Sequence, residues 1–266
     1  IFKKFSHLGY NCFGCCDSFT SYLKMKNKIK KYLKLIKFYL VGIRHNLIPL
    51  PRKPEEKITP YSMFKDEEMK KCYEHFKKYF KSSVFLTTTK LAREYAIKKS
   101  LKNDLNNDKF YVEFGVHTGG SINFFSKYAK HIYGFDSFEG LKEDWHGTLD
   151  LTAGTFDRKK LLPKTNSNVT LISGWVQDTV ENFLNEKKPK INFVHMDLDT
   201  YESSKFVLEK IKPYLEKNCT LIFDELYNYP GWDVGEYKAL KEVFDEKEYK
   251  YLAFTAEGTS AVIQLI

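Results

Sequence analysis

The sequence predicts an α/β fold with a mostly parallel sheet, running from about residue 110 to the C-terminus. Two observations lead to this prediction. Short apolar runs alternate with amphipathic helical segments over this region, an order typical of βαβ units. Polar residues also follow several of the apolar runs directly, and parallel sheets bind their ligands at the carboxyl ends of their strands.

Seven apolar runs are long enough to form the strands of this sheet. We expect strands at Phe110–Phe114, His131–Phe135, Val169–Ser173, Ile191–Met196, Thr220–Phe223, Tyr249–Phe254 and Ala261–Leu265. Between them we expect helices near Ser121–Ala129, Thr179–Asn185, Ser203–Leu215 and Glu236–Phe244. The segment Ser62–Lys99, ahead of the sheet, should be helical, because apolar residues share a face in Glu67–Phe80 and recur at helical spacing in a second helix, Thr88–Lys99.

Length and charge divide the chain into three parts. A chain of 266 residues can hold one large α/β domain and an extension. The net charge is +9, but residues 1–60 carry 13 Lys and Arg against three acidic residues, which leaves 30 basic and 31 acidic residues in the remainder. We expect a basic extension with a proline-rich linker at 1–60, a helical cap at 61–109 and the main domain at 110–266. Residues 61–266 therefore carry no excess positive charge, which argues against nucleic acid as a partner.

The basic extension contains one amphipathic segment, residues 22–48. Lysines alternate there with apolar residues at near-helical spacing, a pattern compatible with peripheral contact with an anionic membrane. Packing on the chain's own domain or on a second subunit would explain it equally well. The longest uncharged run, Phe38–Ile43, is too short to cross a bilayer.

Cysteine usage indicates a reducing compartment. The five cysteines are odd in number and sparse beyond the start of the chain, which argues against a disulfide framework and favours the cytoplasm. Cys12, Cys15 and Cys16 lie close together, but no second Cys or His pair with zinc-ligand spacing follows them. We therefore expect no structural zinc site.

The first strand leads into a glycine-rich turn with the sequence EFGVHTGGS. Glycine lets the backbone approach a ligand closely, and the following helix offers free N–H groups. The spacing is not the G-x-G-x-x-G of dinucleotide sites, and the acidic Glu113 suits the amino or sulfonium group of S-adenosylmethionine better than a pyrophosphate. The cofactor-binding residues predicted here are Glu113, Gly115, Gly119 and Ser121.

The next two strands end in further candidate cofactor residues. Asp136 lies 23 residues after Glu113, where such sheets place a carboxylate that accepts both ribose hydroxyls. With Ser137 it could instead cap a turn. Trp175 follows Gly174 after the third strand, where its ring could stack on adenine or serve as a core or lid residue.

Acidic residues follow two strands that should be neighbours in the sheet. Asp197 and Asp199 close the fourth strand, and Asp224 and Glu225 close the fifth. Four converging carboxylates repel one another, and a hard cation such as Mg²⁺ relieves that repulsion. Such a cation would bind a substrate hydroxyl and lower its pKa, and a spare carboxylate could accept the proton. These acids could alternatively cap helices or pair with lysines. His195 precedes them within a buried strand, where we expect a hydrogen-bonded core residue.

Five motifs together resemble the macrocin O-methyltransferase family. They are EFGVHTGGS, GFDSFEGL followed by DWHG, SGWVQDT, FVHMDLDTYESS and FDELYNYPGWDVGE, within residues 110–240. The resemblance implies a Rossmann-like class I methyltransferase sheet of seven strands, the last antiparallel, behind an N-terminal helical extension. It further implies S-adenosylmethionine as cofactor, Mg²⁺ dependence, a sugar hydroxyl as acceptor and a homo-oligomer. It places the metal on Asp197, Asp224 and Glu225, with Asp197 or Asp199 as the catalytic base.

Two other functions remain open on the sequence alone. A nicotinamide-dependent oxidoreductase could use a similar sheet, although the G-x-G-x-x-G pattern and a Tyr-x-x-x-Lys pair are both missing. A catalytically silent binding protein on the same fold, associated with a membrane or nucleic acid, would explain the basic extension.

Overall fold

The computed structural model describes residues 29, 30, 32, 33 and 58–266. The chain divides into two compact units, Ile1–Ile58 and Thr59–Ile266. Apart from four helical positions, the cysteine motif, the amphipathic segment and the proline-rich linker lie outside the described residues. Within the described part, every helix is too short or too polar to span a bilayer.

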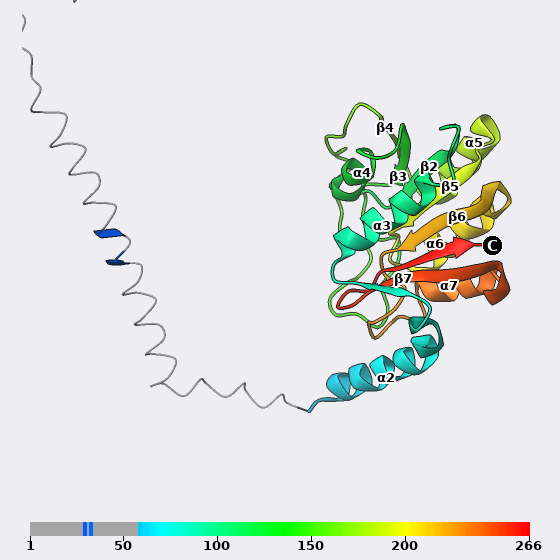
Figure 1. Ribbon diagram of the computed structural model, residues 1–266. Helices are drawn as coiled ribbons and strands as arrows, with labels where there is room; N and C mark the ends of the chain where they lie inside the picture. Colours follow the sequence, from blue (N-terminus) through cyan, green and yellow to red (C-terminus); the bar gives the residue numbers. More distant parts are fainter. Residues whose placement is uncertain (1–28, 31, 34–57) are drawn as a thin grey trace, which may run out of the picture. The chain divides into compact units, whose positions relative to one another are not determined.

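The second unit is built on one eight-stranded sheet, shown in Figure 1. Its strands are β1 (Val84–Leu86), β2 (Phe110–Phe114), β3 (Ile132–Asp136), β4 (Val169–Ser173), β5 (Ile191–Met196), β6 (Leu215–Phe223), β7 (Tyr249–Thr255) and β8 (Ala261–Leu265). They lie in the order β1-β7-β8-β6-β5-β2-β3-β4. Only β8 runs antiparallel to its neighbours, β6 and β7. This arrangement confirms the predicted Rossmann-like sheet with its antiparallel last strand.

The eighth strand corrects the predicted number of seven. β1 pairs in parallel with β7 at the edge of the sheet. It is only three residues long, and Val84 and Phe85 are both exposed, so it shows no alternation by which a strand could be recognised. The segment expected to form a helical cap therefore also contributes a strand to the sheet.

The helices begin and end close to the predicted positions. They are α2 (Pro60–Phe80), α3 (Thr89–Leu101), α4 (Gly120–Phe125), α5 (Val176–Lys187), α6 (Tyr201–Ile211) and α7 (Glu236–Val243), with short 3₁₀ helices at Lys212–Tyr214 and Glu246–Glu248. α2 begins two residues before the predicted Ser62, and Thr59 and Ser62 form a capping box at its start. α4 ends at Phe125, before the predicted Ala129.

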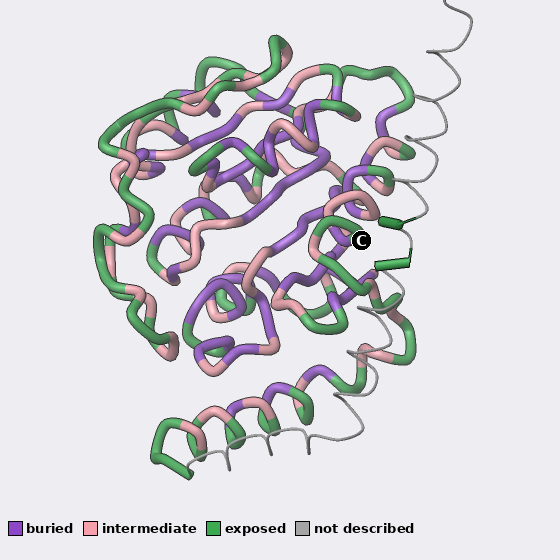
Figure 2. Tube along the Cα trace, turned by 90° about the vertical axis from the view of Figure 1, so that its left-hand side faces the viewer, coloured by how far each residue is buried: buried purple, intermediate pink, exposed green. Residues whose placement is uncertain are grey.

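Two hydrophobic cores pack the helices on opposite faces of the sheet. α3 and α4 cover one face, where Ala96, Ile122 and Phe125 meet Phe193 of β5. α5, α6 and α7 cover the other face, around residues such as Val180 and Leu208. Figure 2 shows buried residues running along the strands between these layers. The rim at the carboxyl ends of the strands is thus held by packing on both sides.

Candidate active site

The turn after β2 brings the backbone of β2 against the end of β5. Gly115 has φ of 89°, a left-handed conformation that L side chains rarely adopt. A Cβ atom at this position would lie 1.7 Å from the carbonyl oxygen of Asp197. The N–H group of Gly115 donates a hydrogen bond to the Phe135 carbonyl at 2.9 Å. Glycine is therefore required here for two independent reasons, its dihedral angle and the close approach of Asp197.

Asp136 holds this turn in place. Its Oδ2 atom accepts hydrogen bonds from the N–H groups of Val116 and His117 at 2.8 and 2.7 Å, and its Oδ1 accepts from Phe138 at 2.6 Å. The turn-capping role that the sequence left open is therefore present. The ribose contact predicted for Asp136 would use the remaining acceptor capacity of the same carboxylate.

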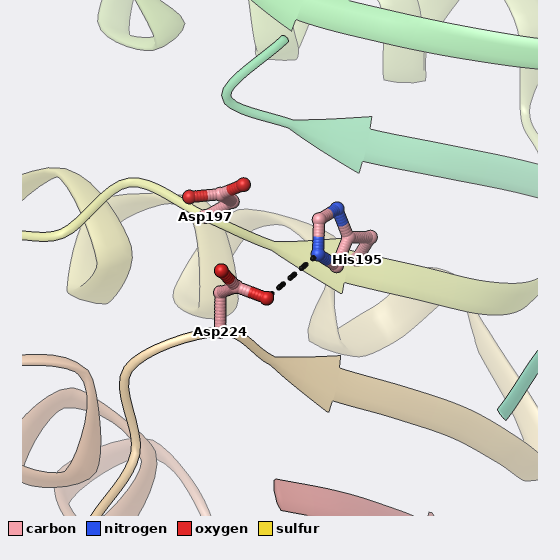
Figure 3. Close-up of side chains that lie close together, drawn as sticks. All are labelled: His195, Asp197 and Asp224. Atoms are coloured by element: carbon pink, nitrogen blue, oxygen red, sulfur yellow. Dashed lines mark ion pairs between the residues drawn. The ribbon is translucent and has the colours of Figure 1, made fainter. Parts of the chain in front are cut away.

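The four predicted acidic residues lie at one edge of the sheet. β5 and β6 are parallel neighbours, which confirms the expected adjacency of the two strands. Figure 3 shows Asp197 and Asp224 at the ends of these strands, with the His195 ring beside Asp224. Two sets of side chains have ligand atoms within 4.8 Å of one another. One comprises His195, Asp197 and Asp224, and the other Asp197, Asp199 and Glu225.

Arg93 of α3 provides a cation that the sequence analysis did not predict. Its Nη2 lies 3.0 Å from Oδ1 of Asp224 and 3.8 Å from Oδ2 of Asp197. Burial lowers the pKa of Arg93, but the charges of Asp224 and Asp197 outweigh burial and raise it. Only four of the 43 basic residues are arginines. The sequence signal that could have identified Arg93 is an arginine in a chain whose basic residues are nearly all lysines.

His195 is a second buried cation beside Asp224. Its ring is fully buried, with Nε2 3.6 Å from Oδ1 of Asp224 and Nδ1 3.6 Å from Oε1 of Glu113. These distances are too long for hydrogen bonds, and neither nitrogen has another partner in the described chain. Burial lowers the pKa of His195, but the two carboxylates outweigh it and raise the pKa to about 10. The expected burial is present, whereas the expected hydrogen bonds are not.

These cations divide the acidic residues into two electrostatic groups. Burial raises the pKa of Asp224, but His195 and Arg93 outweigh this and hold it at about 2. Burial and the nearby Asp224 raise the pKa of Asp199 to about 7, and the same causes raise the pKa values of Asp197 and Glu225. Asp224 is thus compensated within the protein, whereas Asp197, Asp199 and Glu225 retain strong mutual repulsion.

Glu236, the first residue of α7, ties together the two loops that carry these acids. It is fully buried, and its carboxylate accepts from the N–H groups of Leu198 and Glu225, both at 3.2 Å. Glu236 could not be singled out from the sequence, because an acidic residue in the first turn of a helix is common and needs no special explanation.

A pocket of about 270 Å³ opens at this edge, a volume suited to a ligand rather than to a single water molecule. Seven predicted site residues line it: Gly115, Asp136, Ser137, Trp175, Asp197, Asp199 and Glu225. Five others are not among its lining residues: Glu113, Gly119, Ser121, Gly174 and Asp224. Glu113 is fully buried and accepts from the Ser121 hydroxyl at 2.5 Å. Glu113 does not reach the pocket surface, so the contact with a cofactor that the sequence predicts for it is not possible unless neighbouring side chains move.

The pocket-lining acids fit a divalent cation. Asp197, Asp199 and Glu225 offer carboxylate oxygens, the ligand type that Mg²⁺ prefers. Glu225 Oε2 is buried without a hydrogen-bond partner among the described residues, and such an atom calls for a partner of some kind. Asp224 fits less well than predicted, because Arg93 already binds it.

Replacing Arg93 with methionine should destabilise the fold by about 2–3 kcal/mol. Truncating one partner of a fully buried ion pair costs about 3–5 kcal/mol, and the loss should be smaller here because Arg93 and Asp224 are 23% and 17% exposed. Urea denaturation would measure the change. Arg158→Met is the matched control, because Arg158 forms no ion pair within the described part of the chain. Equal stability of the two variants would contradict a structural role for the Arg93 charge.

Comparison with known proteins agrees with this fold. Residues 112–226 match a family described as a methyltransferase domain. The crystal structure of CalS11, a calicheamicin methyltransferase, aligns with a TM-score of 0.55 at 22% identity, covering 85% of this chain and 90% of that one. A search of curated proteins finds no match.

Two further solved structures align over a smaller share of the chain. Apo CalS11, a TDP-rhamnose 3'-O-methyltransferase, has a TM-score of 0.49 and 26% identity over 66% of this chain and 77% of that one. The O-methyltransferase NovP has a TM-score of 0.45 and 19% identity over 66% and 78% of the two chains. The narrower resemblance to macrocin O-methyltransferases stays a prediction. The strand order and the domain match together support a methyltransferase of class I.

Proposed function

We propose that the chain is an S-adenosylmethionine-dependent, Mg²⁺-dependent O-methyltransferase acting on a hydroxyl group of a sugar or a sugar-bearing small molecule. One observation carries the proposal. A glycine turn and an acidic cluster, which lie far apart in the sequence, line a single pocket at the carboxyl ends of the strands. The match to a methyltransferase domain over residues 112–226 supports the reaction class.

The cofactor would occupy the side of the pocket formed by β2, β3 and the start of α5. Gly115 leaves room for it there, Asp136 and Ser137 offer acceptors for ribose hydroxyls, and the Trp175 ring offers a face for adenine. S-adenosylmethionine would supply the methyl group and leave as S-adenosylhomocysteine. Glu113, Gly119 and Ser121, which are buried, and the half-buried Gly174 would act by holding this turn and the neighbouring strand end in shape.

Asp197, Asp199 and Glu225 would hold the Mg²⁺ ion. Bound there, the ion would lower the pKa of an acceptor hydroxyl and favour its alkoxide. Arg93 and His195 already form ion pairs with Asp224. We therefore propose that Asp224 does not bind the metal and instead holds these two cations beside the metal ligands. The family resemblance implies Asp224 as the third metal ligand beside Asp197 and Glu225. In the ligand set proposed here, Asp199 takes the place of Asp224.

Chemistry at this site would depend mainly on positioning. Methyl transfer from a sulfonium is an in-line displacement that needs no covalent nucleophile from the protein, so orientation of the two reactants can provide much of the rate enhancement. Asp197 or Asp199 would accept the hydroxyl proton. Glu236 keeps both acidic loops in register through its two backbone hydrogen bonds, which fixes these carboxylates relative to the cofactor side of the pocket.

We expect S-adenosylmethionine to bind with a dissociation constant in the micromolar range, about −8 kcal/mol, and a chelator such as EDTA to abolish turnover. Isothermal titration calorimetry with the full chain measures binding, and methyl transfer with and without restored Mg²⁺ measures metal dependence. NADH serves as the control ligand. Calorimetry that shows no binding of S-adenosylmethionine, or clear binding of NADH instead, would argue for a different enzyme class.

We also propose a cytoplasmic location and a homo-oligomeric assembly, as the cysteine pattern and the family resemblance imply. Peripheral membrane contact through residues 22–48 stays a separate prediction. Flotation with anionic vesicles, comparing the full chain with a form that begins at Ser62, would test that contact.

A further inference from the structure

The connection between β3 and β4, residues 137–168, contains no helix, and its only β-structure is an isolated bridge between Glu139 and Asp157. β3 and β4 are parallel neighbours, and strands of this kind are usually joined through an α-helix. A connection longer than about 12–15 residues with no secondary structure of its own is uncommon in a compact domain and is usually functional. This connection therefore calls for an explanation beyond joining two strands.

Hydrogen bonds hold the second half of this connection against the domain. The N–H group of Lys160 donates to the Phe138 carbonyl at 2.9 Å. The side-chain amide of Asn123, in α4, donates to the Lys164 carbonyl, also at 2.9 Å. The segment between these two contacts is thus held at both ends. We call residues 158–164, with the sequence RKKLLPK, the basic loop.

The basic loop exposes two consecutive leucines. Leu161 and Leu162 are 66% and 56% exposed, although the backbone on either side of them is hydrogen-bonded to the domain. A single exposed apolar side chain is common and needs no explanation. Two adjacent ones on a loop that is held in place leave apolar surface in water, and apolar surface rimmed by polar residues is a feature of interaction sites.

Positive charge surrounds these leucines. The basic residues of the loop stand on both sides of them: Arg158, Lys159, Lys160 and Lys164. Asp157 directly precedes the loop, and Lys160 forms an ion pair with Glu139 at 3.2 Å. Lys159 and Lys164 are exposed, and neither forms an ion pair within the described residues. The loop therefore offers apolar surface and uncompensated positive charge side by side.

We propose that the basic loop binds the surface of an anionic lipid bilayer, with Leu161 and Leu162 inserted at the boundary between headgroups and acyl chains. Apolar side chains stabilise binding there by leaving water, and Lys and Arg residues near the surface are attracted by its negative potential. This contact lies on the folded domain, is separate from the one predicted for residues 22–48, and does not depend on the proposed function.

Two other partners fit the loop less well. A nucleic acid would pair with the lysines but leave the two leucines in water. A second copy of the chain could cover the leucines, but a two-fold interface places the same surface of both copies face to face. Lysines would then meet lysines and repel one another. A bilayer that contains anionic lipids satisfies both the apolar and the charged groups.

Flotation of the full chain with vesicles of phosphatidylserine and phosphatidylcholine tests the proposal. We expect Leu161→Gln/Leu162→Gln to lower the partition coefficient roughly tenfold, because both side chains lose their apolar contribution. Lys159→Glu/Lys164→Glu should lower it at least roughly tenfold at low salt. This second effect should disappear on vesicles of phosphatidylcholine alone.

Matched controls lie in and next to α2, which leads into β1 at the opposite edge of the sheet from β4 (Figure 1). Met63→Gln/Phe64→Gln replaces two consecutive exposed apolar residues, and Lys70→Glu/Lys81→Glu reverses two exposed charges. Both controls should bind vesicles like the parent chain. Equal binding by the loop variants and their controls would overturn the proposal. An effect of the lysine variant alone would also overturn it, because the loop would then bind a polyanion other than a bilayer.

A probe within the loop is needed as well, because residues 1–60 are also strongly basic. Brominated phosphatidylcholine in the same anionic vesicles should quench Leu162→Trp beyond the parent chain with its three tryptophans, and should not do so for Met63→Trp. Equal quenching of the two variants would contradict insertion of the loop. Dissociation of an oligomer by the leucine variant in sedimentation velocity, with vesicle binding unchanged, would assign the leucines to a contact between copies instead. Urea denaturation should show every loop variant to be as stable as the parent, so that a loss of vesicle binding reports on the loop and not on the fold.

Discussion

Asp197→Asn should lower kcat roughly 10²–10³-fold, the largest effect on activity that we expect from a single substitution at the site. Asp197 belongs to both groups of converging ligand atoms. The substitution keeps the shape of the side chain but removes the charge that would hold Mg²⁺ and accept the hydroxyl proton. Steady-state kinetics would measure kcat, and calorimetry should show that affinity for S-adenosylmethionine is nearly unchanged.

Two comparisons make this prediction specific. Asp178→Asn removes a charge at an exposed position in the first turn of α5 and should leave kcat unchanged. Asp199→Asn should weaken Mg²⁺ activation more than Asp224→Asn does, because Arg93 already occupies Asp224. A normal kcat for Asp197→Asn would remove Asp197 from the chemistry. A larger metal defect in Asp224→Asn would restore the ligand set implied by the family resemblance.

The sequence pattern could predict the position of the acidic residues because it depends on local periodicity and a general rule of parallel sheets. Asp197 and Asp224 each follow a buried run, and parallel neighbours end at the same edge. The direction in which each side chain points at that edge depends on residues that are distant in the sequence, so local periodicity cannot predict it. Glu113 lies near the end of β2 and Asp136 ends β3. Glu113 is nevertheless fully buried and does not line the pocket, whereas Asp136 lines it and accepts hydrogen bonds from the turn.

The compensating charges could not be predicted for a related reason. Arg93 and Asp224 are separated by 131 residues, and only the packing of α3 on β6 brings them together. Periodicity indicates that α3 has a buried face but not which strand end that face meets. His195 lies in a buried strand whichever partners it has, so its two carboxylate neighbours become visible only when β2, β5 and β6 are aligned.

Gly115→Ala should produce the largest loss of stability, about 3–5 kcal/mol. The left-handed φ of 89° strains an alanine by about 1–3 kcal/mol. The added methyl group would also overlap the Asp197 carbonyl at 1.7 Å, and overpacking of this kind costs typically about 1–3 kcal/mol more. Urea denaturation would measure the change, and kcat should fall with it, because relief of the overlap must move the backbone of Asp197.

Gly120→Ala is the matched control for this substitution. Gly120 lies five residues further along, begins α4, and a Cβ there would meet no atom within 4 Å. Alanine is favoured over glycine in helices by up to about 1 kcal/mol, so this variant should be as stable as the parent or slightly more stable. If both substitutions left stability and kcat unchanged, the turn after β2 could not be in contact with the end of β5. Because the proposed cofactor side and the acidic side of the pocket meet at this contact, the assignment of a single active site depends on the difference between the two variants.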